Sequence, residues 1–190
     1  MKKYSVAVAG ATGLVGRKML QILEERNFPV GNLVPLASAS SAGSTLQFAG
    51  QDIVIHELTE SSFEGVDLAL FSAGGDVSKV FAPIAAAAGA VVVDNSSAWR
   101  MDNNVPLVVP EVNPHALSEH SGIIANPNCS TIQMVVALEP LRRFGIKRIV
   151  VSTYQGVTGS GKKAVEQLSQ ELEGNQATNP AYPHPIANNC

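Results

Sequence analysis

The sequence predicts an α/β fold built on a doubly wound, mostly parallel sheet. The apolar run at residues 4–9 ends in a glycine-rich turn and is followed by a stretch with helical spacing of apolar residues. An apolar run, a helical stretch and another apolar run follow in the same order over residues 66–94. Successive strand–helix–strand units are typical of Rossmann-like sheets with helices on both faces.

Residues 4–9 (YSVAVA) are expected to form a buried strand, because the run is short, apolar and ends at a glycine. A helix is expected over residues 13–26. Its apolar side chains fall on one face, namely Val15, Met19, Ile22 and Leu23. Residues 33–37 (LVPLA) are a second predicted strand, in which Pro35 indicates an edge position because proline cannot donate a ladder hydrogen bond.

Residues 46–48 and 53–58, joined by residues 49–52, are expected to form an inserted hairpin. The elements expected next are a strand at 66–71, a loop at 72–76, a helix at 77–88 that ends at Gly89, and a strand at 91–94. The segment 95–128 holds four prolines and is expected to be irregular and to wrap one edge of the domain.

A helix is expected over residues 129–143, with Pro140 kinking its last turn. The elements expected after it are a strand at 148–155, a glycine-rich turn at 156–161, an amphipathic helix at 162–173 and a loop at 174–190.

The composition excludes several classes of protein. A net charge of −3 gives no electrostatic case for binding nucleic acid or an anionic membrane. The longest apolar run, residues 81–93, is broken by Pro83 and Gly89 and falls short of the roughly 20 residues of a membrane helix. Two cysteines do not make a disulfide framework, so a reducing, cytoplasmic setting is expected, and no metal site is predicted.

The turn Gly10–Gly16 (GATGLVG) lies between the first strand and the first helix. Glycines allow a sharp turn and a close approach to a pyrophosphate, and the free amides at the helix N-terminus point at the anion. The spacing GxxGxxG is a variant of the dinucleotide fingerprint, and its position between strand and helix predicts a nucleotide site. The alternative is a tight turn whose glycines serve packing only.

The end of the second strand indicates which nucleotide is bound. An acidic residue there hydrogen-bonds the ribose 2′-hydroxyl of NAD. Residues 37–44 (ASASSAGS) contain no acid, and their hydroxyls and amides can accept a 2′-phosphate. NADP is therefore the predicted cofactor, and a solvated serine–glycine loop without a ligand is the alternative.

Cys129 follows Asn126-Pro127-Asn128 at the start of a predicted helix. The positive end of the helix dipole favours a thiolate, and the free amides there could form an oxyanion hole. A thiolate beside a nicotinamide pocket suits covalent hydride chemistry through an acyl-enzyme. The alternative is a small buried hydrophobe. Cys190 lacks this context and is interpreted as structural.

Several motifs resemble the aspartate-semialdehyde dehydrogenase family. They are GATGLVG at 10–16, SAGG at 72–75, DNSSAWRMD at 94–102, VPLVVPEVNP at 105–114, NPNCSTIQM at 126–134 and TYQGVTGSG at 153–161. They occur in the family's order over nearly the whole chain. The resemblance implies an NADP-binding Rossmann-like domain at residues 1–128 and the beginning of an α+β catalytic/dimerisation domain at 129–190.

The resemblance also implies a reaction. L-aspartyl 4-phosphate and NADPH give L-aspartate 4-semialdehyde, phosphate and NADP, in the biosynthesis of lysine, threonine, methionine, isoleucine and diaminopimelate. Cys129 is similar to the nucleophile that forms the acyl-thioester, and Gln155 to the glutamine that positions the substrate. Arg100 resembles an arginine that binds the substrate phosphate, and Asn128 resembles its neighbour in the same pocket. The resemblance also implies a set of cofactor-binding residues in addition to Gly10. They are Thr12, Gly13, Leu14, Val15, Ser40, Ser41, Thr158 and Gly159.

Two departures from the family pattern are evident. Family members often carry basic residues in the loop after the second strand, where this sequence has Ser40 and Ser44, which leaves the strength of the NADP preference open. Family chains also continue well beyond residue 190, into the segment that supplies the acid–base histidine, a substrate-binding arginine and a phosphate-binding lysine. The chain is therefore interpreted as a fragment with little or no turnover, from a full-length homodimer or larger oligomer.

Four histidines are interpreted as surface or loop residues: His56, His115, His120 and His184. Two rival functions stay open at this point. One is another acyl-phosphate reductase, such as N-acetyl-γ-glutamyl-phosphate reductase, whose cysteine motif is closer to PGCY than to PNCST. The other is a non-catalytic nucleotide-binding module.

Overall fold

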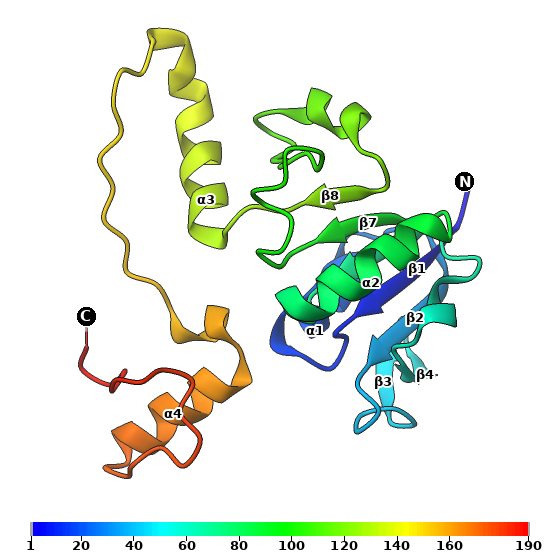
Figure 1. The fold of residues 1–190 in the computed structure, drawn as a ribbon, viewed down its shortest axis with the longest axis horizontal. Coiled ribbons are helices and arrows are strands. Elements are labelled where there is room, and N and C mark those ends of the chain that lie inside the picture. The colour runs from blue at the N-terminus through cyan, green and yellow to red at the C-terminus, as the bar shows by residue number, and fades with distance from the viewer. Residues whose placement is uncertain (1, 190) are drawn as a thin grey trace. The chain divides into compact units, whose positions relative to one another are not determined.

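The computed structural model describes residues 2–189 and divides into two compact units, the first ending at Gly145 and the second beginning at Ile146 (Figure 1). The first unit is built on a six-stranded, all-parallel sheet in the order β5-β2-β1-β6-β7-β8. Its strands are β1 (Tyr4–Ala9), β2 (Val30–Ala37), β5 (His56–Glu57), β6 (Leu68–Phe71), β7 (Val91–Asp94) and β8 (Ile123–Ala125). The predicted Rossmann-like fold class is confirmed.

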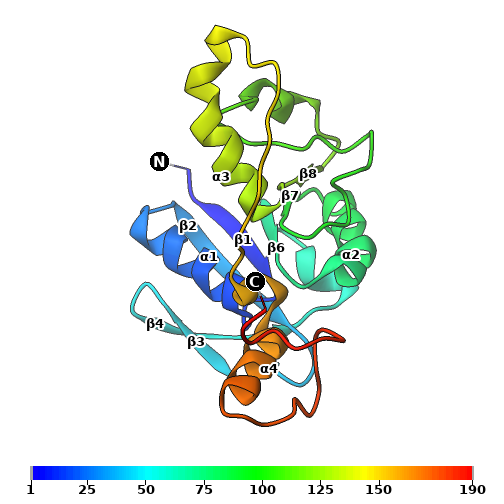
Figure 2. The ribbon, with the colours of Figure 1, turned by 90° about the vertical axis from the view of Figure 1, so that its left-hand side faces the viewer.

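Two helices cover the opposite faces of this sheet (Figure 2). Alternate residues of β1 explain why, since successive strand side chains point to opposite faces. Ala7 and Ala9 belong to the cluster that contains Ala82 and Ala85 of α2 (Gly75–Ala87), whereas Val8 packs with Leu20 of α1 (Leu14–Glu25). Residues 6–9 of the strand are therefore all apolar, because both faces of the sheet are buried there.

The predicted hairpin is present as β3 (Thr45–Phe48) and β4 (Gln51–Val54), which pair antiparallel and pack Phe48 against the α1 side of the sheet. The expected strand 53–58 is divided, however. Its first two residues complete the hairpin, and β5 leaves it to join β2 in the main sheet.

Pro35 does not mark an edge strand, because β2 lies between β1 and β5. Strand β5 pairs only with Leu36 and Ala37, so no ladder hydrogen bond to β5 is required at Pro35. The missing N–H of proline therefore breaks no bond there.

The segment 95–128 is more regular than expected. It contains the 3-10 helix η2 (Pro114–Glu119) and β8, which pairs parallel with β7 and forms the sixth strand. The buried residues Ile123, Ile124 and Ala125 form this strand. The four prolines favour an irregular segment, but the stretch between Pro114 and Pro127 is long enough to hold a parallel strand of three residues.

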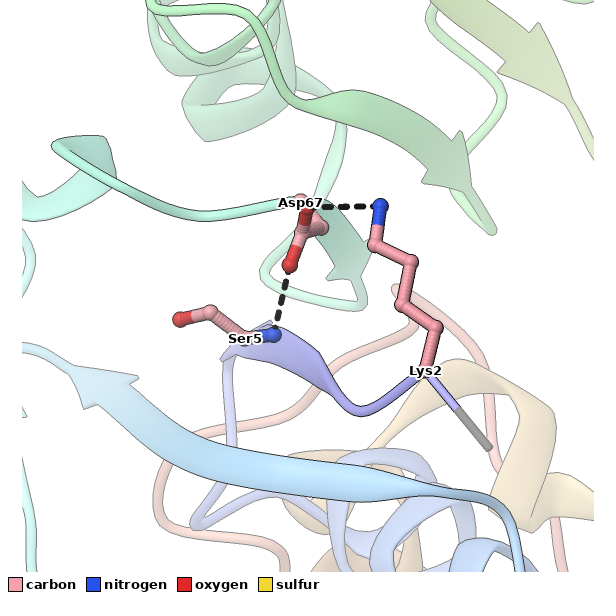
Figure 3. Close-up of polar contacts among 3 residues, drawn as sticks. All are labelled: Lys2, Ser5 and Asp67. Atoms are coloured by element: carbon pink, nitrogen blue, oxygen red, sulfur yellow. Dashed lines mark hydrogen bonds and ion pairs between the residues drawn. The ribbon is translucent and has the colours of Figure 1, made fainter.

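Asp67 ties together the amino ends of three strands. Its carboxylate accepts the Ser5 amide N–H at 2.8 Å and lies 3.6 Å from Lys2 Nζ (Figure 3). Its own amide donates to the Ser5 carbonyl at 2.9 Å, and its carbonyl accepts from Val91 N at 3.0 Å. This junction holds β1, β6 and β7 in register at the edge opposite their carboxyl ends.

The predicted helix after residue 128 is shorter than expected. Helix α3 spans Cys129–Leu138, and Pro140 lies in the 3-10 helix η3 (Glu139–Phe144). The ring of proline carries no N–H and clashes with the preceding turn, so the α-helix ends before it instead of bending.

The second unit contains the 3-10 helix η4 (Val157–Ser160) and the predicted amphipathic helix, α4 (Lys162–Leu172). The predicted strand at 148–155 is wrong for this structure, because these residues are exposed coil. A β-strand needs a neighbour for its backbone groups, and none of residues 2–189 pairs with this segment. No helix within residues 2–189 has the length and apolar character needed to cross a membrane.

Candidate functional site

The predicted site residues of the first unit lie in or directly after loops that leave the same edge of the sheet. Because the strands are parallel, their carboxyl ends share that edge, and the first amide after each strand hydrogen-bonds the end of its neighbour. These bonds are Gly10 N to Leu36 O (2.9 Å), Ser72 N to Ala9 O (2.8 Å), Asn95 N to Phe71 O (2.9 Å) and Asn126 N to Asp94 O (2.8 Å). The loops after β1, β6, β7 and β8 are thus fixed side by side.

A pocket of about 440 Å³ opens at the carboxyl ends of β1, β2, β5 and β6. The residues that line it are Gly10, Thr12, Gly13, Ala37, Ser38, Ala39, Glu57, Leu58, Ser72, Ala73, Val77 and Phe81. Strands β1 and β6 are neighbours, and the helices that follow them cover opposite faces (Figure 2). The pocket therefore lies at the topological switch point, where open α/β sheets bind ligands.

The glycine-rich turn brings three pieces of backbone close together at this pocket. Gly10 has a φ of +86°, and a Cβ there would lie 2.4 Å from Ser72 O. A Cβ on Gly16 would lie 2.1 Å from Gly10 O. Gly13 is the N-cap of α1 and offers no capping side chain, so the first-turn amides stay available to an anion. These features fit the pyrophosphate of a dinucleotide.

The predicted nucleotide residues differ in their placement. Gly10, Thr12 and Gly13 line the pocket, whereas Leu14 and Val15 begin α1 with exposed side chains.

Ser40 and Ser41 do not line the pocket themselves but support Ser38, which does. The Ser40 hydroxyl lies 2.9 Å from that of Ser38, and Ser41 N donates to Ser38 O at 2.9 Å. Thr158 and Gly159 lie in η4 of the second unit.

Arg100 is held by two main-chain carbonyls. Its Nε donates to Asn126 O at 2.9 Å and its Nη2 to Asn95 O at 3.0 Å, and the side-chain amide of Asn126 donates to that of Asn95 at 2.6 Å. A guanidinium has five N–H donors, so three remain for a ligand. The half-buried Arg100 is therefore a fixed cation between the loops after β7 and β8.

Three further hydrogen bonds anchor the loop that carries Arg100. Asp94, fully buried at the end of β7, accepts from the Ser96 hydroxyl at 2.6 Å and from the Ser96 amide at 3.1 Å. The indole N–H of Trp99 donates to Ser78 of α2 at 2.9 Å. The motif DNSSAWR therefore builds the support for its own arginine.

Cys129 is the first residue of α3, and its side chain is exposed. Asn128 is the N-cap, and its side-chain oxygen accepts from Ser130 N at 3.0 Å and Thr131 N at 3.4 Å. That oxygen is occupied by capping, so only the side-chain N–H₂ of Asn128 remains for the phosphate contact predicted for it. Cys129 follows Asn126, the residue that holds Arg100, by three positions.

Gln155 lies in exposed coil of the second unit, where its side-chain amide donates to the Thr153 hydroxyl at 3.1 Å. Its predicted positioning role stays a prediction. The four histidines lie as expected, with His56, His115 and His184 exposed and His120 half-buried. Cys190 lies outside the described residues.

Sequence reasoning missed several residues at this edge. Asn95 and Asn126 lie inside motifs that the sequence singles out, but the contact of Asn126 with Arg100 depends on β8, which the sequence does not predict. Glu57 and Leu58 reach the pocket through β5, whose separation from the hairpin had no signal in the alternation of apolar residues.

Comparisons with known proteins agree with this arrangement. The family model "Semialdehyde dehydrogenase, NAD binding domain" matches residues 5–120, and "Semialdehyde dehydrogenase, dimerisation domain" matches residues 138–190. The aspartate-semialdehyde dehydrogenase of Bacillus subtilis is 57% identical over 169 residues, which cover 88% of this chain and 49% of that protein. The enzyme of Aquifex aeolicus is 56% identical over 196 residues, covering 98% of this chain and 58% of that protein.

Among solved structures, aspartate semialdehyde dehydrogenase II of Vibrio cholerae complexed with ASA matches with a TM-score of 0.93 at 48% identity, over 100% of this chain and 59% of that one. The Candida albicans enzyme with NADP matches with a TM-score of 0.66 at 29% identity, over 76% and 48%. The chain thus spans about half the length of the relatives it matches. It belongs to the semialdehyde dehydrogenase family, and the relatives it matches there are aspartate-semialdehyde dehydrogenases.

Proposed function

We propose that the enzyme containing these residues reduces L-aspartyl 4-phosphate to L-aspartate 4-semialdehyde, with NADPH as the reductant and Cys129 as the acyl carrier. The observation that carries this proposal is the fixed Arg100, bound to Asn126 O three residues before a cysteine that begins a helix. A cation for a phosphate and a nucleophile for its acyl group are thereby held on adjoining loops. The names of the relatives favour the aspartyl substrate over other acyl phosphates.

The first step is attack of the Cys129 thiolate on the acyl carbon. The C–S bond forms, the C–O bond to phosphate breaks, and inorganic phosphate leaves with the electron pair. The free N–H donors of Arg100 bind the phosphate as its charge grows, and the side-chain N–H₂ of Asn128 is a further donor. Gln155 orients the substrate in this proposal.

A bound nicotinamide nucleotide supplies the hydride that converts the acyl group to the aldehyde oxidation level. The chain's part is to hold that nucleotide. The turn Gly10–Gly16 would lie against the pyrophosphate, and the first-turn amides of α1 would donate to it. Ser38, supported by Ser40 and Ser41, offers hydroxyl and amide donors to the 2′-phosphate of NADP.

The remaining features of the proposal concern the whole protein. We place the boundary between the nucleotide-binding and catalytic domains at residues 128 and 129. Residues 138–190 match a dimerisation domain, so we propose a homo-oligomer, a dimer or tetramer, in the cytoplasm. We expect residues 1–190 alone to turn over little substrate, because they span only about half the length of the relatives they match.

Oxidation of NADPH tests this function directly. The enzyme containing these residues should oxidise NADPH with L-aspartyl 4-phosphate and release one phosphate for each NADPH consumed. N-acetyl-γ-glutamyl phosphate should support a rate at least about 100-fold lower, as expected for a site that pairs with polar groups of its own substrate. A preference for the second substrate would reject the proposed activity.

A further inference from the structure

Strand β5 places an acidic residue beside the end of β2. The parallel register pairs Ala37 with Glu57, and Leu58 N donates to Ala37 O at 2.8 Å. Glu57 lines the pocket together with Ala37, Ser38 and Ala39. It therefore reaches the corner of the pocket where the loop after β2 begins.

That corner is where dinucleotide-binding sheets distinguish their ligands. An acidic residue at the end of the second strand accepts a hydrogen bond from the ribose 2′-hydroxyl of NAD, whereas an arginine nearby accommodates the 2′-phosphate of NADP. Strand β2 itself ends in Ala37-Ser38-Ala39, with no acid and no base. Glu57 supplies a carboxylate at the same level of the sheet, from the neighbouring strand.

No basic side chain in the described lining of the pocket offsets this charge. Of the residues that line it, Glu57 alone carries an ionisable side chain. The ion pairs found within residues 2–189 join Lys2 to Asp67, Arg142 to Glu139, and Lys162 to Glu166, so none neutralises Glu57. Arg17 donates to Thr12 O, on the turn after β1.

A 2′-phosphate carries nearly two negative charges, which the carboxylate of Glu57 would repel at close range. A 2′-hydroxyl would instead donate to the same carboxylate. The hydroxyls and amides of the Ser38–Ser41 loop can still bind a phosphate, but they carry no compensating charge.

We propose that Glu57 sets the nucleotide selectivity of the pocket and that the pocket binds NAD as well as NADP. This inference rests on the proposed nucleotide-binding function and concerns which form of the nucleotide is bound. The preference for NADP over NAD is small, because the loop after β2 favours the 2′-phosphate while Glu57 opposes it.

Isothermal titration of the protein with NAD and with NADP tests the inference, using Glu57→Gln and the matched control Glu64→Gln. Both residues are exposed, so neither change leaves a buried gap, and Glu64 lies outside the pocket lining. The two dissociation constants of the unmodified protein should lie within about tenfold of each other. Glu57→Gln should shift their ratio toward NADP by about tenfold, and Glu64→Gln should leave it unchanged.

Salt provides a second readout that needs no variant. Because a repulsion is screened by salt, raising the ionic strength should improve NADP binding relative to NAD in the unmodified protein and change the ratio much less in Glu57→Gln. A phosphate held by cations would respond in the opposite sense.

The outcomes separate this inference from the function on which it rests. If both nucleotides bind but Glu57→Gln leaves their ratio where Glu64→Gln does, the role of Glu57 is rejected and nucleotide binding stands. A preference of the unmodified protein for NADP beyond about 100-fold rejects it as well. If neither nucleotide binds, the proposed nucleotide site and this inference both fall.

Discussion

Arg100 donates from its Nε to the main-chain carbonyl of Asn126 at 2.9 Å, two residues before the N-cap of the helix that Cys129 begins. The bond joins the loop after β7 to the loop after β8. Its partner is a backbone atom of a segment that is itself bonded to the end of β7 through Asn126 N and Asp94 O. The sheet therefore fixes the distance between the cation and the start of the helix.

The fork geometry of Arg100 predicts a large effect for Arg100→Lys. An ammonium group cannot donate to Asn95 O and Asn126 O and also bind a phosphate through a planar edge. Loss of charged hydrogen bonds of about 1.5–3 kcal/mol should lower kcat/KM for the acyl phosphate by about 10–100-fold. Inhibition by inorganic phosphate should weaken by a similar factor. Arg26→Lys, at the end of α1, is the control, and an unchanged inhibition constant for phosphate would remove Arg100 from the phosphate site.

Gly10→Ala should both destabilise the protein and impair nucleotide binding. Gly10 and Gly65 share a positive φ, but only at Gly10 would a Cβ meet backbone, 2.4 Å from Ser72 O. Gly65→Ala should cost about 1 kcal/mol through backbone strain alone. Gly10→Ala should cost at least about 1–3 kcal/mol more because of the overlap. Chemical denaturation measures both variants, and equal losses would show that the loops after β1 and β6 are not in close contact.

The junction at Asp67 makes a prediction about stability away from the site (Figure 3). Asp67→Ala leaves the Ser5 amide without its acceptor and should lower the free energy of unfolding by about 1–2 kcal/mol. Lys2→Met removes an exposed ion pair and the contact of Lys2 Nζ with the Tyr4 ring, and should cost less than about 1 kcal/mol. Nucleotide affinity should not change in either variant, because the junction lies at the opposite edge of the sheet. A larger loss in Lys2→Met than in Asp67→Ala would contradict this division.

Glu171 makes the second unit sensitive to acid. The N–H of Ala187 first, and then the Gln167 side chain, lower the pKa of Glu171 below its ordinary value of 4.5, with the N–H of Ile186 acting in the same direction against some desolvation. A lowered pKa in the folded state gives stability above the ordinary value, which is lost as pH falls through the lowered one.

Thermal denaturation with Glu171→Gln checks this assignment. The variant should melt at a lower temperature than the unmodified protein near about pH 7, and the difference should shrink as the pH falls below 4.5 and through the lowered pKa of Glu171. Glu173→Gln, one residue beyond α4, is the control. A difference that persists in acid would mean that Glu171 acts through shape rather than through charge.

Periodicity predicted most of the nucleotide-binding fold. The helices α1 and α2 and strands β1, β6 and β7 are regular, long enough and apolar on the required faces. Short strands were harder, because β5 has two residues and β8 has three, and neither shows a pattern of its own. Their pairing is decided by the neighbouring strand, which a local sequence window does not contain.

The residues of the candidate site can be predicted from their chemistry, but the contacts that position them cannot. Cys129 and Arg100 could be chosen from residue type and motif, but the carbonyl groups that orient Arg100 belong to residues 5 and 26 positions away from it. Backbone acceptors have no residue type, so the sequence carries no signal for Asn95 O or Asn126 O. Residues 148–155 show the converse case, in which composition suggests an element that the structure lacks. Their apolar composition favours a strand, but no strand within the described residues pairs with them.

The acyl-enzyme itself tests the central role of Cys129 most directly. The enzyme containing these residues, incubated with L-aspartyl 4-phosphate in the absence of NADPH and quenched in acid, should carry one aspartyl group on the peptide that includes Cys129, detected by mass spectrometry. Addition of NADPH before the acid quench should discharge the acyl group as the aldehyde. The Cys129→Ser variant should carry no thioester and should lose turnover by at least about 1000-fold. Normal turnover in Cys129→Ser, or an adduct on a different residue, would contradict the mechanism.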